Sequence, residues 1–552
     1  MLEGCTPFPQ EFAERYIREG YWQSQTLGDF LQDAAQRFGE RIAVSDISRR
    51  LSYRELDKLS TRLALHLLRR GFLPRDTVLL QLPNTWEFPA IFFALMKIGV
   101  LPVMCLPPHR NTELTYFARL AGCKGYFVAP MLRGFDYLAM AREIQSEVPQ
   151  LQTIVALGDG TQSGVSFVAP WLDDPAENQY PAGHLAQFRP DPFDVAFFLL
   201  SGGTTGIPKL IPRTHADYLH NARECARALE WDASLVFLVV IPAAHNFPLG
   251  APGLVGAISA GGSVAMCASP DPDTVFETIQ RDRGTVLAVS PALLITLLNA
   301  PSRTKYDLSS LQFVCAGGQK MLPELVDRSY AAWPQVRVGH AFGMAEGLIN
   351  LTHPDDSMEV VRETQGRPVS PGDEIRIVDD VGQDVPTGQS GELITRGPYT
   401  IRGYYRAEEH NRTAFTPDGF YRTGDVVRMH RTGNLVVEGR KKDMINRGGE
   451  KISAEEIENL ILAHEHVHMA AVVAMPDAVM GEKSCAFVIP RPGRSLTLAQ
   501  LCDFLLQKKI AKFKLPERLE LVQSFPLTGV GKVSKKDLRE LIAQRLRAEA
   551  KP

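Results

Sequence analysis

Ser201-Gly202-Gly203-Thr204-Thr205-Gly206-Ile207-Pro208-Lys209 directly follows the apolar run Val195-Ala196-Phe197-Phe198-Leu199-Leu200. Six apolar residues before a glycine-rich loop predict a buried strand that ends at the loop. The loop offers backbone N–H groups, three hydroxyls and one lysine, which are the groups that hold a polyphosphate. A mobile surface turn has a similar composition, so this stretch alone leaves both interpretations open.

The loop is not a Walker A motif, because the spacing G-x-x-x-x-G-K-[ST] is absent. Pro208 separates the last glycine from Lys209, and Leu210 stands where a magnesium-binding hydroxyl would be needed. The composition therefore indicates phosphate binding and leaves the reaction open.

Short apolar runs alternate with helical patterns on both sides of the loop. Residues 87–98 have the apolar spacing of a helix. Strand-like runs stand at 77–82, 99–104, 126–129, 235–241, 285–289 and 311–316. Such alternation predicts a layered α/β fold with parallel strands, which we expect to form a large N-terminal domain of two layered α/β subdomains.

The pattern changes after about Glu374, where short strands alternate with turns. Runs at 375–378, 391–396 and 434–439 predict a small antiparallel β subdomain. A charged cluster at 439–443 precedes a last unit of about 110 residues that mixes strands with amphipathic helices. We expect an N-terminal core of residues 1–439, a hinge at 440–442 and a small mobile α+β domain at 443–552.

The composition limits the partners and the compartment. The 60 basic and 63 acidic residues give a formal net charge of −3, which offers no electrostatic case for a nucleic-acid partner. The eight cysteines are scattered without a C-x-x-C pair, which favours reduced thiols in a cytoplasmic protein. The N-terminus lacks the basic start and the apolar core of a signal peptide.

Residues 235–270 contain no Asp, Glu, Lys or Arg, so they resemble a membrane segment in a hydropathy plot. Their prolines and glycines disfavour a spanning helix. We expect this segment to form a buried strand, a site loop and a helix of small residues in a soluble cytoplasmic protein with no membrane partner.

Several further motifs, taken together with the loop, resemble the adenylate-forming superfamily of acyl- and aryl-acid activating enzymes. The resemblance covers essentially the whole chain, and its motifs are specific in combination. They are Ser201 to Lys209, Phe342-Gly343-Met344-Ala345-Glu346-Gly347, Gly391-Glu392-Leu393, Tyr421-Arg422-Thr423-Gly424-Asp425, Gly439-Arg440-Lys441-Lys442-Asp443, Asn446-Arg447-Gly448-Gly449-Glu450-Lys451 and Pro526-Leu527-Thr528-Gly529-Val530-Gly531-Lys532.

The resemblance implies that the chain uses ATP and Mg²⁺. Glu346, in the short turn after Phe342, looks like the magnesium ligand, since a carboxylate oxygen suits a hard cation. Phe342 looks suited to stack on adenine, and Asp425, in a turn, to accept hydrogen bonds from the ribose with help from Arg440. Without the resemblance, Glu346 would be interpreted as an exposed loop glutamate and Phe342 as a core phenylalanine. Asp425 would be interpreted as a solvated turn aspartate and Arg440 as part of a charged linker. The ATP-binding residues that it implies are Ser201, Gly202, Gly203, Thr204, Thr205, Gly206, Lys209, Gly318, Phe342, Gly343, Met344, Asp425 and Arg440.

Two residues are expected to be catalytic. Lys532 lies in a Gly-Val-Gly-Lys turn, where the backbone can approach a substrate closely. An ammonium there can bridge the attacking carboxylate and the phosphate oxygens as charge develops. The resemblance also implies a catalytic role for His245.

Members of the superfamily complete their reaction in a second step, in which a pantetheine thiol attacks the acyl-adenylate. The resemblance implies that the C-terminal domain rotates between the steps about Lys442. It also implies that Gly448, Gly449 and Lys451 then line the thiol tunnel. A Lys-Lys pair at a domain boundary is also a plausible hinge on general grounds.

The residues expected to bind the acid resemble most closely those of stand-alone aryl-acid adenylating enzymes of siderophore and related pathways. Ala244-His245-Asn246-Phe247-Pro248-Leu249 resembles their signature, as does Pro9-Gln10-Glu11-Phe12-Ala13. Asn246 stands where amino-acid-activating relatives carry an aspartate, so an uncharged amide can meet an ortho hydroxyl or amino group on a benzoate. The expected pocket residues are Asn246, Phe247, Ala251, Gly318 and Ala341.

Two of these positions depart from the commoner pattern. Ala251 stands where serine or cysteine is usual, and Ala341 where valine is usual. Both changes remove volume, so we expect a salicylate- or anthranilate-like acid with room for a ring substituent, with 2,3-dihydroxybenzoate as a close alternative.

The chain extends about twenty residues beyond Lys532 and contains no Gly-Gly-x-Ser attachment site after it, so the phosphopantetheine is expected on a separate aryl carrier protein. The runner-up is an aryl-CoA ligase that uses free coenzyme A. A third possibility, an inactive scaffold that binds an adenylate, predicts erosion at Lys209, Glu346, Asp425 or Lys532, and all four are intact. A dinucleotide-binding oxidoreductase is disfavoured because no G-x-G-x-x-G appears in a strand–helix setting.

Overall fold

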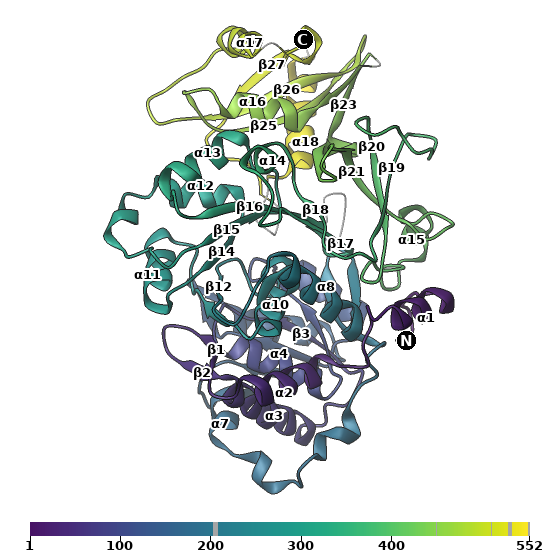
Figure 1. Ribbon diagram of the computed structural model, residues 1–552, viewed down its shortest axis with the longest axis vertical. Coiled ribbons are helices and arrows are strands. Elements are labelled where there is room, and N and C mark those ends of the chain that lie inside the picture. Colours follow the sequence, from purple (N-terminus) through teal and green to yellow (C-terminus); the bar gives the residue numbers. More distant parts are fainter. Residues whose placement is uncertain (202–207, 449, 509, 528–532, 550–552) are drawn as a thin grey trace. The chain divides into compact units, whose positions relative to one another are not determined.

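The computed structural model describes residues 1–201, 208–448, 450–508, 510–527 and 533–549 (Figure 1). Contacts between Cα atoms divide the chain into two compact units. The larger unit contains the described residues up to 374 and residues 395–421, and the smaller unit contains residues 375–394 and those from 422 onward. The two units are described separately.

A seven-stranded sheet forms one layer of the larger unit. Its strands pair in the order β11-β10-β4-β3-β5-β8-β9. Their bounds are β3 Thr77–Gln81, β4 Leu101–Met104, β5 Gly125–Val128, β8 Thr153–Ala156, β9 Val165–Phe167, β10 Val195–Leu200 and β11 Leu210–Thr214. All of these pairs are parallel except β10 with β11. The inner strands are buried along their length, which explains why the sequence shows continuous apolar runs.

A nine-stranded sheet forms the second layered part of the larger unit, in the order β18-β17-β16-β15-β14-β12-β13-β1-β2. Five parallel pairs run from β1 to β16, and antiparallel pairs close both edges. The bounds are β1 Ile42–Ser45, β2 Arg50–Ser52, β12 Val236–Val239, β13 Ser263–Met266, β14 Val286–Val289, β15 Phe313–Gly317, β16 Arg337–Met344, β17 Gly347–Leu351 and β18 Arg367–Pro368. The predicted α/β architecture with parallel strands is confirmed.

Helices connect these strands, and several begin where the sequence provides a cap. In α8 the Thr214 hydroxyl accepts from the Asp217 N–H while the Asp217 carboxylate accepts from the Thr214 N–H, which satisfies two otherwise unpaired donors. Helices α2, α3 and α4 lie side by side (Figure 1). The helices of this unit are α1 Gln10–Arg18, α2 Leu27–Phe38, α3 Tyr53–Arg69, α4 Glu87–Lys97, α5 Asn111–Ala121, α6 Tyr137–Glu147, α7 Val168–Asp173, α8 His215–Ala228, α9 Asn246–Gly250, α10 Gly253–Ser259, α11 Pro272–Asp282, α12 Pro291–Asn299, α13 Pro323–Ala332, α14 Met358–Glu363 and α15 Glu408–Ala414.

The charge-free segment 235–270 folds into strand β12, the short helices α9 and α10, and strand β13. It therefore holds the expected strand and small-residue helix, together with a second strand. Across the part of the chain that the structure describes, no helix is both long enough and apolar enough to span a bilayer.

The smaller unit contains two further sheets. A four-stranded sheet, in the order β19-β20-β21-β22, is formed by Glu374–Val378, Ser390–Arg396, Tyr421–Met429 and Leu435–Arg440. A five-stranded sheet pairs β24-β23-β26-β25 with β27 on β26, formed by β23 Met444–Arg447, β24 Glu450–Ser453, β25 Val467–Asp477, β26 Gly481–Pro490 and β27 Arg518–Leu521. The accompanying helices are α16 Ala454–Leu462, α17 Leu498–Gln507 and α18 Lys535–Glu549.

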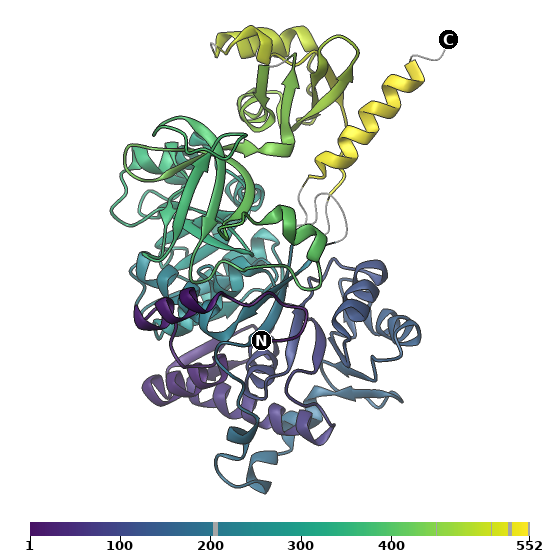
Figure 2. The same ribbon diagram turned by 90° about the vertical axis from the view of Figure 1, so that its right-hand side faces the viewer.

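The last helix is part of this unit's core. Leu538 and Ile542 of α18, drawn in yellow in Figure 2, pack with Ala471 and Val473 of β25. The contacts group the four-stranded sheet with the C-terminal region, whereas the sequence placed that sheet in a core ending at residue 439. The hinge at 440–442 stays a prediction.

Asn84 fixes the segment that leads from β12 into α9. Its side chain is buried, and its Oδ1 accepts from the Ala243 N–H at 2.8 Å. Its amide nitrogen lies 3.0–3.2 Å from the carbonyl oxygens of Val239, Val240, Ile241 and Cys267, which share its two N–H donors. One side chain thus satisfies backbone groups at the carboxyl ends of two neighbouring strands.

We expect Asn84→Ala to lower the free energy of unfolding by about 2–3 kcal/mol, because buried backbone groups lose their partner. Urea unfolding followed by circular dichroism measures the shift. Asn178→Ala, at an exposed position, serves as the control and should leave the midpoint unchanged. Equal midpoints of urea unfolding for Asn84→Ala and the native chain would show that Asn84 does not stabilise this segment.

Candidate functional site

The predicted phosphate loop connects two antiparallel strands. Leu200 of β10 pairs with Leu210 of β11, and the Ser201 N–H donates to the Lys209 carbonyl at 3.0 Å. The Lys209 N–H donates to the Ser201 hydroxyl at 2.9 Å. Both ends of the loop are therefore held side by side, and the chain returns as a strand rather than as the helix of a Walker A motif. The predicted residues Gly202, Gly203, Thr204, Thr205 and Gly206 lie outside the described residues.

Glu346 lies in the two-residue turn between β16 and β17, as the sequence predicted. Its side chain is buried, and its Oε1 accepts a hydrogen bond from the Tyr404 hydroxyl at 2.7 Å. Burial and the Glu346 carboxylate raise the pKa of Tyr404, so the phenol stays protonated and donates. The Lys209 ammonium lies 5.8 Å from the centre of the Tyr404 ring. Tyr404 thus brings the loop lysine and the candidate metal ligand to one place.

The single carboxylate of Glu346 suits Mg²⁺. Its second oxygen, Oε2, accepts no hydrogen bond from the described residues. The described parts of the chain hold no group of three or more His, Cys, Asp or Glu that could form a complete metal site. Mg²⁺ usually takes one or two carboxylates and completes its shell with water and substrate phosphates, so one carboxylate beside a phosphate loop fits it.

A fully buried arginine anchors the turn that carries Glu346. Arg213 of β11 donates from Nη1 to the Ala345 carbonyl at 3.0 Å and from Nε to Asp217 at 2.9 Å. Its guanidinium also lies 4.8 Å from the centre of the Tyr218 ring. The residue that precedes Glu346 is therefore anchored to a charge pair in the core.

Phe342, Gly343 and Met344 form the end of strand β16, next to this turn. Phe342 is half-buried, and Gly343 is exposed. The Asn350 amide donates to the Phe342 carbonyl at 3.0 Å and so fixes the strand end. These residues therefore lie at the end of the strand that leads into the Glu346 turn.

Three apolar positions form one wall beside β16. Gly317 of β15 pairs in register with Ala341, and a Cβ atom at Gly317 would lie only 3.0 Å from Cε1 of Phe247. The buried Phe247 ring therefore packs against bare backbone at Gly317. Gly318, the predicted residue, is exposed and has a φ of 83°. Gly317 itself was not predicted, because its importance depends on the ring of Phe247.

The remaining residues that the sequence predicts for the acid pocket lie at the two ends of α9. Asn246 and Ala251 are both buried. His245 is the N-cap, and its Nδ1 accepts from the Phe247 N–H at 3.2 Å. The structure thus gives His245 a positioning contact, and its catalytic role stays a prediction.

The smaller unit carries the predicted ribose residues. Asp425 lies within strand β21, so its expected position in a turn is wrong. It pairs in register with Arg440 of β22, whose Nε lies 2.6 Å from the buried carboxylate. The sequence suggested a turn because Thr423-Gly424 precedes Asp425, but strand β21 extends through that glycine. The structure brings Asp425 and Arg440 together.

The residues predicted for the second step lie further along this unit. Lys442 is exposed in a short 3₁₀ turn, whose last residue, Asp443, pairs with Arg539 of α18 at 2.8 Å. Gly448 has a φ of 59°, and its N–H donates to the Met480 carbonyl at 2.8 Å. Lys451 pairs through its backbone with Asn446. Gly449, Lys532 and the Lys451 side chain lie outside the described residues.

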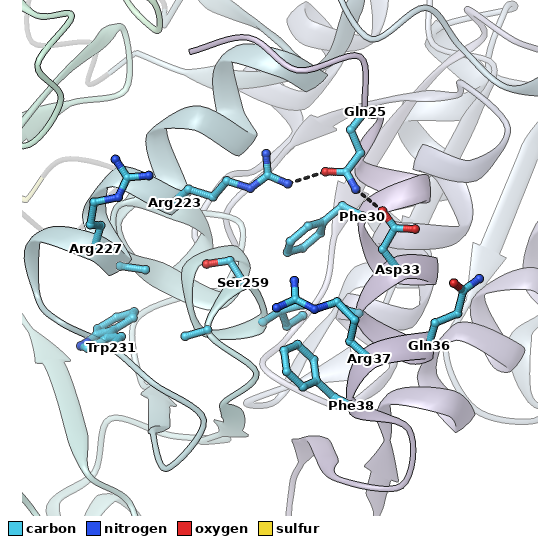
Figure 3. Close-up of a pocket in the computed structure, with 14 residues that line it drawn as sticks. Gln25, Phe30, Asp33, Gln36, Arg37, Phe38, Arg223, Arg227, Trp231 and Ser259 are labelled. Carbon is cyan, nitrogen blue, oxygen red and sulfur yellow. Dashed lines mark hydrogen bonds between the residues drawn. The ribbon is translucent and has the colours of Figure 1, made fainter. Parts of the chain in front are cut away.

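A hollow of about 510 Å³ is lined by α2, α8 and α10 and contains none of the predicted residues (Figure 3). The last turns of the three helices meet there. Because helix C-termini carry partial negative charge, Arg37 and Arg227 in those turns complement them. We interpret this hollow as a gap that remains where the helix ends pack, and we assign no ligand to it.

The chain is similar to known proteins over most of its length. Residues 31–405 match the family model of the AMP-binding enzymes, and residues 456–532 match the AMP-binding enzyme C-terminal domain. The 2,3-dihydroxybenzoate-AMP ligase of Bacillus subtilis is 47% identical over 99% of each chain. The salicyl-AMP ligase / salicyl-S-ArCP synthetase of Mycobacterium tuberculosis is 43% identical over 97% of this chain and 94% of its own. The solved apo structure of MbtA from Mycobacterium smegmatis has a TM-score of 0.73 at 42% identity, covering 97% and 98% of the two chains.

We expect Arg213→Ala to lower the free energy of unfolding by about 3–5 kcal/mol, because Asp217 is left as a buried unpaired charge. Chemical denaturation measures this loss. Arg227→Ala removes a mostly exposed arginine that pairs with Glu224 on the same helix, and it should change stability by less than about 1 kcal/mol. Similar small effects of the two substitutions would show that Arg213 is not a structural anchor.

Proposed function

Since the chain belongs to the AMP-binding enzyme family, we propose that it activates an aryl acid with ATP and passes the acyl group to a thiol. The observation that carries this proposal is the neutral, buried Asn246 at the start of α9, next to the wall formed by Phe247, Gly317 and Ala341. An apolar wall suits an aromatic ring, and an amide suits a polar ring substituent rather than the ammonium group of an amino acid. The names of the two curated relatives, for 2,3-dihydroxybenzoate and salicylate, support the same class of acid.

In the first step the acid's carboxylate oxygen forms a bond to the α-phosphorus of ATP, and the bond to pyrophosphate breaks. Two anions must approach each other, so positioning and charge neutralisation dominate the chemistry. Lys209 and the loop that Ser201 closes would hold the β- and γ-phosphates. Lys532 would stabilise the charge at the reacting oxygens. Asp425, oriented by Arg440, would accept the ribose hydroxyls.

Glu346 would hold the magnesium ion, which supplies charge compensation for the phosphates when it is bound. The Tyr404 hydroxyl fixes one carboxylate oxygen and leaves the other for the ion. The Arg213 contact with Ala345 keeps this turn in place. His245 would position the reacting carboxylate from the N-terminus of α9.

Ala251 and Ala341 would give the acid room. Both carry only a methyl group, and Ala251 is buried at the end of α9. We expect a salicylate-, 2,3-dihydroxybenzoate- or anthranilate-like acid to fit, with space for a further ring substituent. The absence of a hydroxyl at position 251 removes one partner for a 3-hydroxyl group.

In the second step the phosphopantetheine thiol of a separate aryl carrier protein would attack the adenylate and release AMP. Lys442 would act as the pivot between the two steps, and Gly448, Gly449 and Lys451 would line the thiol path. An Asp443–Arg539 ion pair ties the turn after Lys442 to α18, so a rotation there would carry that helix with it.

We expect acid-dependent ATP–pyrophosphate exchange with salicylate-type acids, and a loss of at least about 100-fold in kcat for Lys532→Ala, the scale of one electrostatic group at a reacting oxygen. Exchange of labelled pyrophosphate into ATP measures it. Lys536→Ala removes an exposed lysine four residues further on and serves as the matched control. Retained exchange in Lys532→Ala would contradict the role of that lysine.

For the thiol acceptor, we expect kcat/KM to be at least about tenfold higher with a phosphopantetheinylated aryl carrier protein than with free coenzyme A, since about 1.4 kcal/mol of protein contact gives that ratio. Formation of the thioester, followed by mass spectrometry, measures both reactions. An equal or higher kcat/KM with coenzyme A would favour an aryl-CoA ligase.

A further inference from the structure

A tyrosine outside the sequence motifs contacts the amide of Asn246, which we place in the acid pocket under the proposed function. Tyr218 of α8 is fully buried, and its hydroxyl lies 3.0 Å from Oδ1 of Asn246 at the start of α9. The Asn246 amide nitrogen has no hydrogen-bond partner among the described residues. The two ends of this amide therefore differ, because the oxygen is engaged by the protein and the nitrogen remains available.

The Tyr218 ring is held on several sides. Phe197 meets it edge to face with ring centres 4.7 Å apart, and the Arg213 guanidinium lies 4.8 Å from its centre. At Gly250 a Cβ atom would lie only 2.4 Å from Cε1 of Tyr218, so only glycine admits the ring there. One turn further along α8, Asn221 donates to the Gly250 carbonyl at 2.7 Å. Helix α8 thus holds α9 at both ends, and the position of the hydroxyl is fixed.

The direction of this hydrogen bond follows from the chemistry of its partners. An amide oxygen only accepts, so the Tyr218 hydroxyl donates its proton to Asn246. Burial raises the pKa of Tyr218, which keeps the phenol neutral and able to donate. If the amide were flipped, its NH₂ group would face the hydroxyl, and the phenolic proton would have no acceptor among the described residues. The protein therefore fixes the amide with its NH₂ group away from Tyr218.

An NH₂ group that faces the acid distinguishes between ortho substituents. The phenolic proton of a 2-hydroxybenzoate bonds to the molecule's own carboxylate, and the phenolic oxygen remains able to accept from Asn246. A 2-aminobenzoate also bonds to its own carboxylate, but its second N–H points outward and its nitrogen lone pair is conjugated with the ring. Two donors then face each other, which is unfavourable because neither finds an acceptor.

We propose that Tyr218 is a positioning residue that fixes Asn246 as a hydrogen-bond donor, and that it thereby makes the site select an ortho oxygen over an ortho amino group. This inference rests on the proposed function, since it concerns which aryl acid is activated. It narrows the acids named above to 2-hydroxybenzoates and places anthranilate among the poor substrates.

Salicylate, anthranilate and unsubstituted benzoate test the proposal in the ATP–pyrophosphate exchange reaction of the full chain. For the native protein we expect a lower KM for salicylate than for anthranilate. In Tyr218→Phe the amide loses its fixed orientation, so the KM for salicylate should rise by about tenfold, the scale of one hydrogen bond. The KM for benzoate, which has no ortho group, should not change. A merely structural role would raise the KM for all three acids together and would overturn the proposal.

Tyr126→Phe is the matched control. It removes another buried tyrosine hydroxyl, which donates to Gln81 within the seven-stranded sheet, and it should leave the ratio of the salicylate and anthranilate KM values unchanged. A changed ratio in this control would mean that loss of any buried hydroxyl alters selectivity, which would overturn the proposal.

If Tyr218→Phe does not fold, Asn246→Asp tests the same proposal in the same exchange reaction. One carboxylate oxygen would accept from Tyr218, and the other would face the acid as an acceptor, so the preference should shift toward anthranilate. An unchanged or stronger preference for salicylate in Asn246→Asp would overturn the proposal, as would a native preference for anthranilate. Absence of exchange with every aryl acid, in a folded native protein, would instead contradict the proposed function.

Discussion

The buried charge pair of Arg213 and Asp217 supports both halves of the candidate site. A guanidinium in the core must have partners for its donors, because an unpaired buried charge is strongly unfavourable. In Arg213, Nε finds its partner in the Asp217 carboxylate and Nη1 in the Ala345 carbonyl, while the guanidinium lies 4.8 Å from the centre of the Tyr218 ring. The first contact ties β11 to the start of α8, and the second fixes the turn that carries Glu346. Through Tyr218 the same cation reaches Asn246, so the groups proposed for the phosphates and for the acid share one anchor.

The proposed phosphate loop is followed by a strand, β11, and not by a helix. In a Walker A motif a helix N-terminus supplies part of the positive potential for the phosphates. Here β11 follows the loop, so the positive charge for the proposed phosphates would come from side chains, and Lys209 at the end of the loop is one of them. Tyr404 places this lysine near the Glu346 carboxylate without an ion pair between them. The lysine and the carboxylate are thus kept apart, and each remains available for its own ligand.

Local sequence patterns were sufficient for most of the fold. The strands expected at 77–82, 285–289 and 311–316 are present within two residues of the expected ends, because buried parallel strands leave continuous apolar runs. The structure places the described motif residues of the larger unit at the ends of β10, β16 and α9, and their roles stay predictions. Tyr218, Arg213 and Tyr404 were not found, since their contacts join residues 28, 132 and 58 positions apart. Their roles depend on how α8, β11 and the segment before α15 are packed, which no local pattern records.

The bare backbone at Gly317 would make the proposed acid pocket adjustable on one side only. A Cβ atom at this position would lie 3.0 Å from Cε1 of Phe247 and 3.1 Å from the Ala341 carbonyl oxygen, so a larger residue fits only if the Phe247 ring or the neighbouring strand moves by a few tenths of an ångström. Ala251 and Ala341 already carry Cβ atoms, so their backbone conformations accept a side chain. Divergence among enzymes of this kind can therefore proceed by exchanging two side chains, while the surface against which the ring lies stays constant. Exchanging these two side chains would change which substituents fit at the edge of the substrate's aromatic ring. The plane in which the ring binds would stay the same.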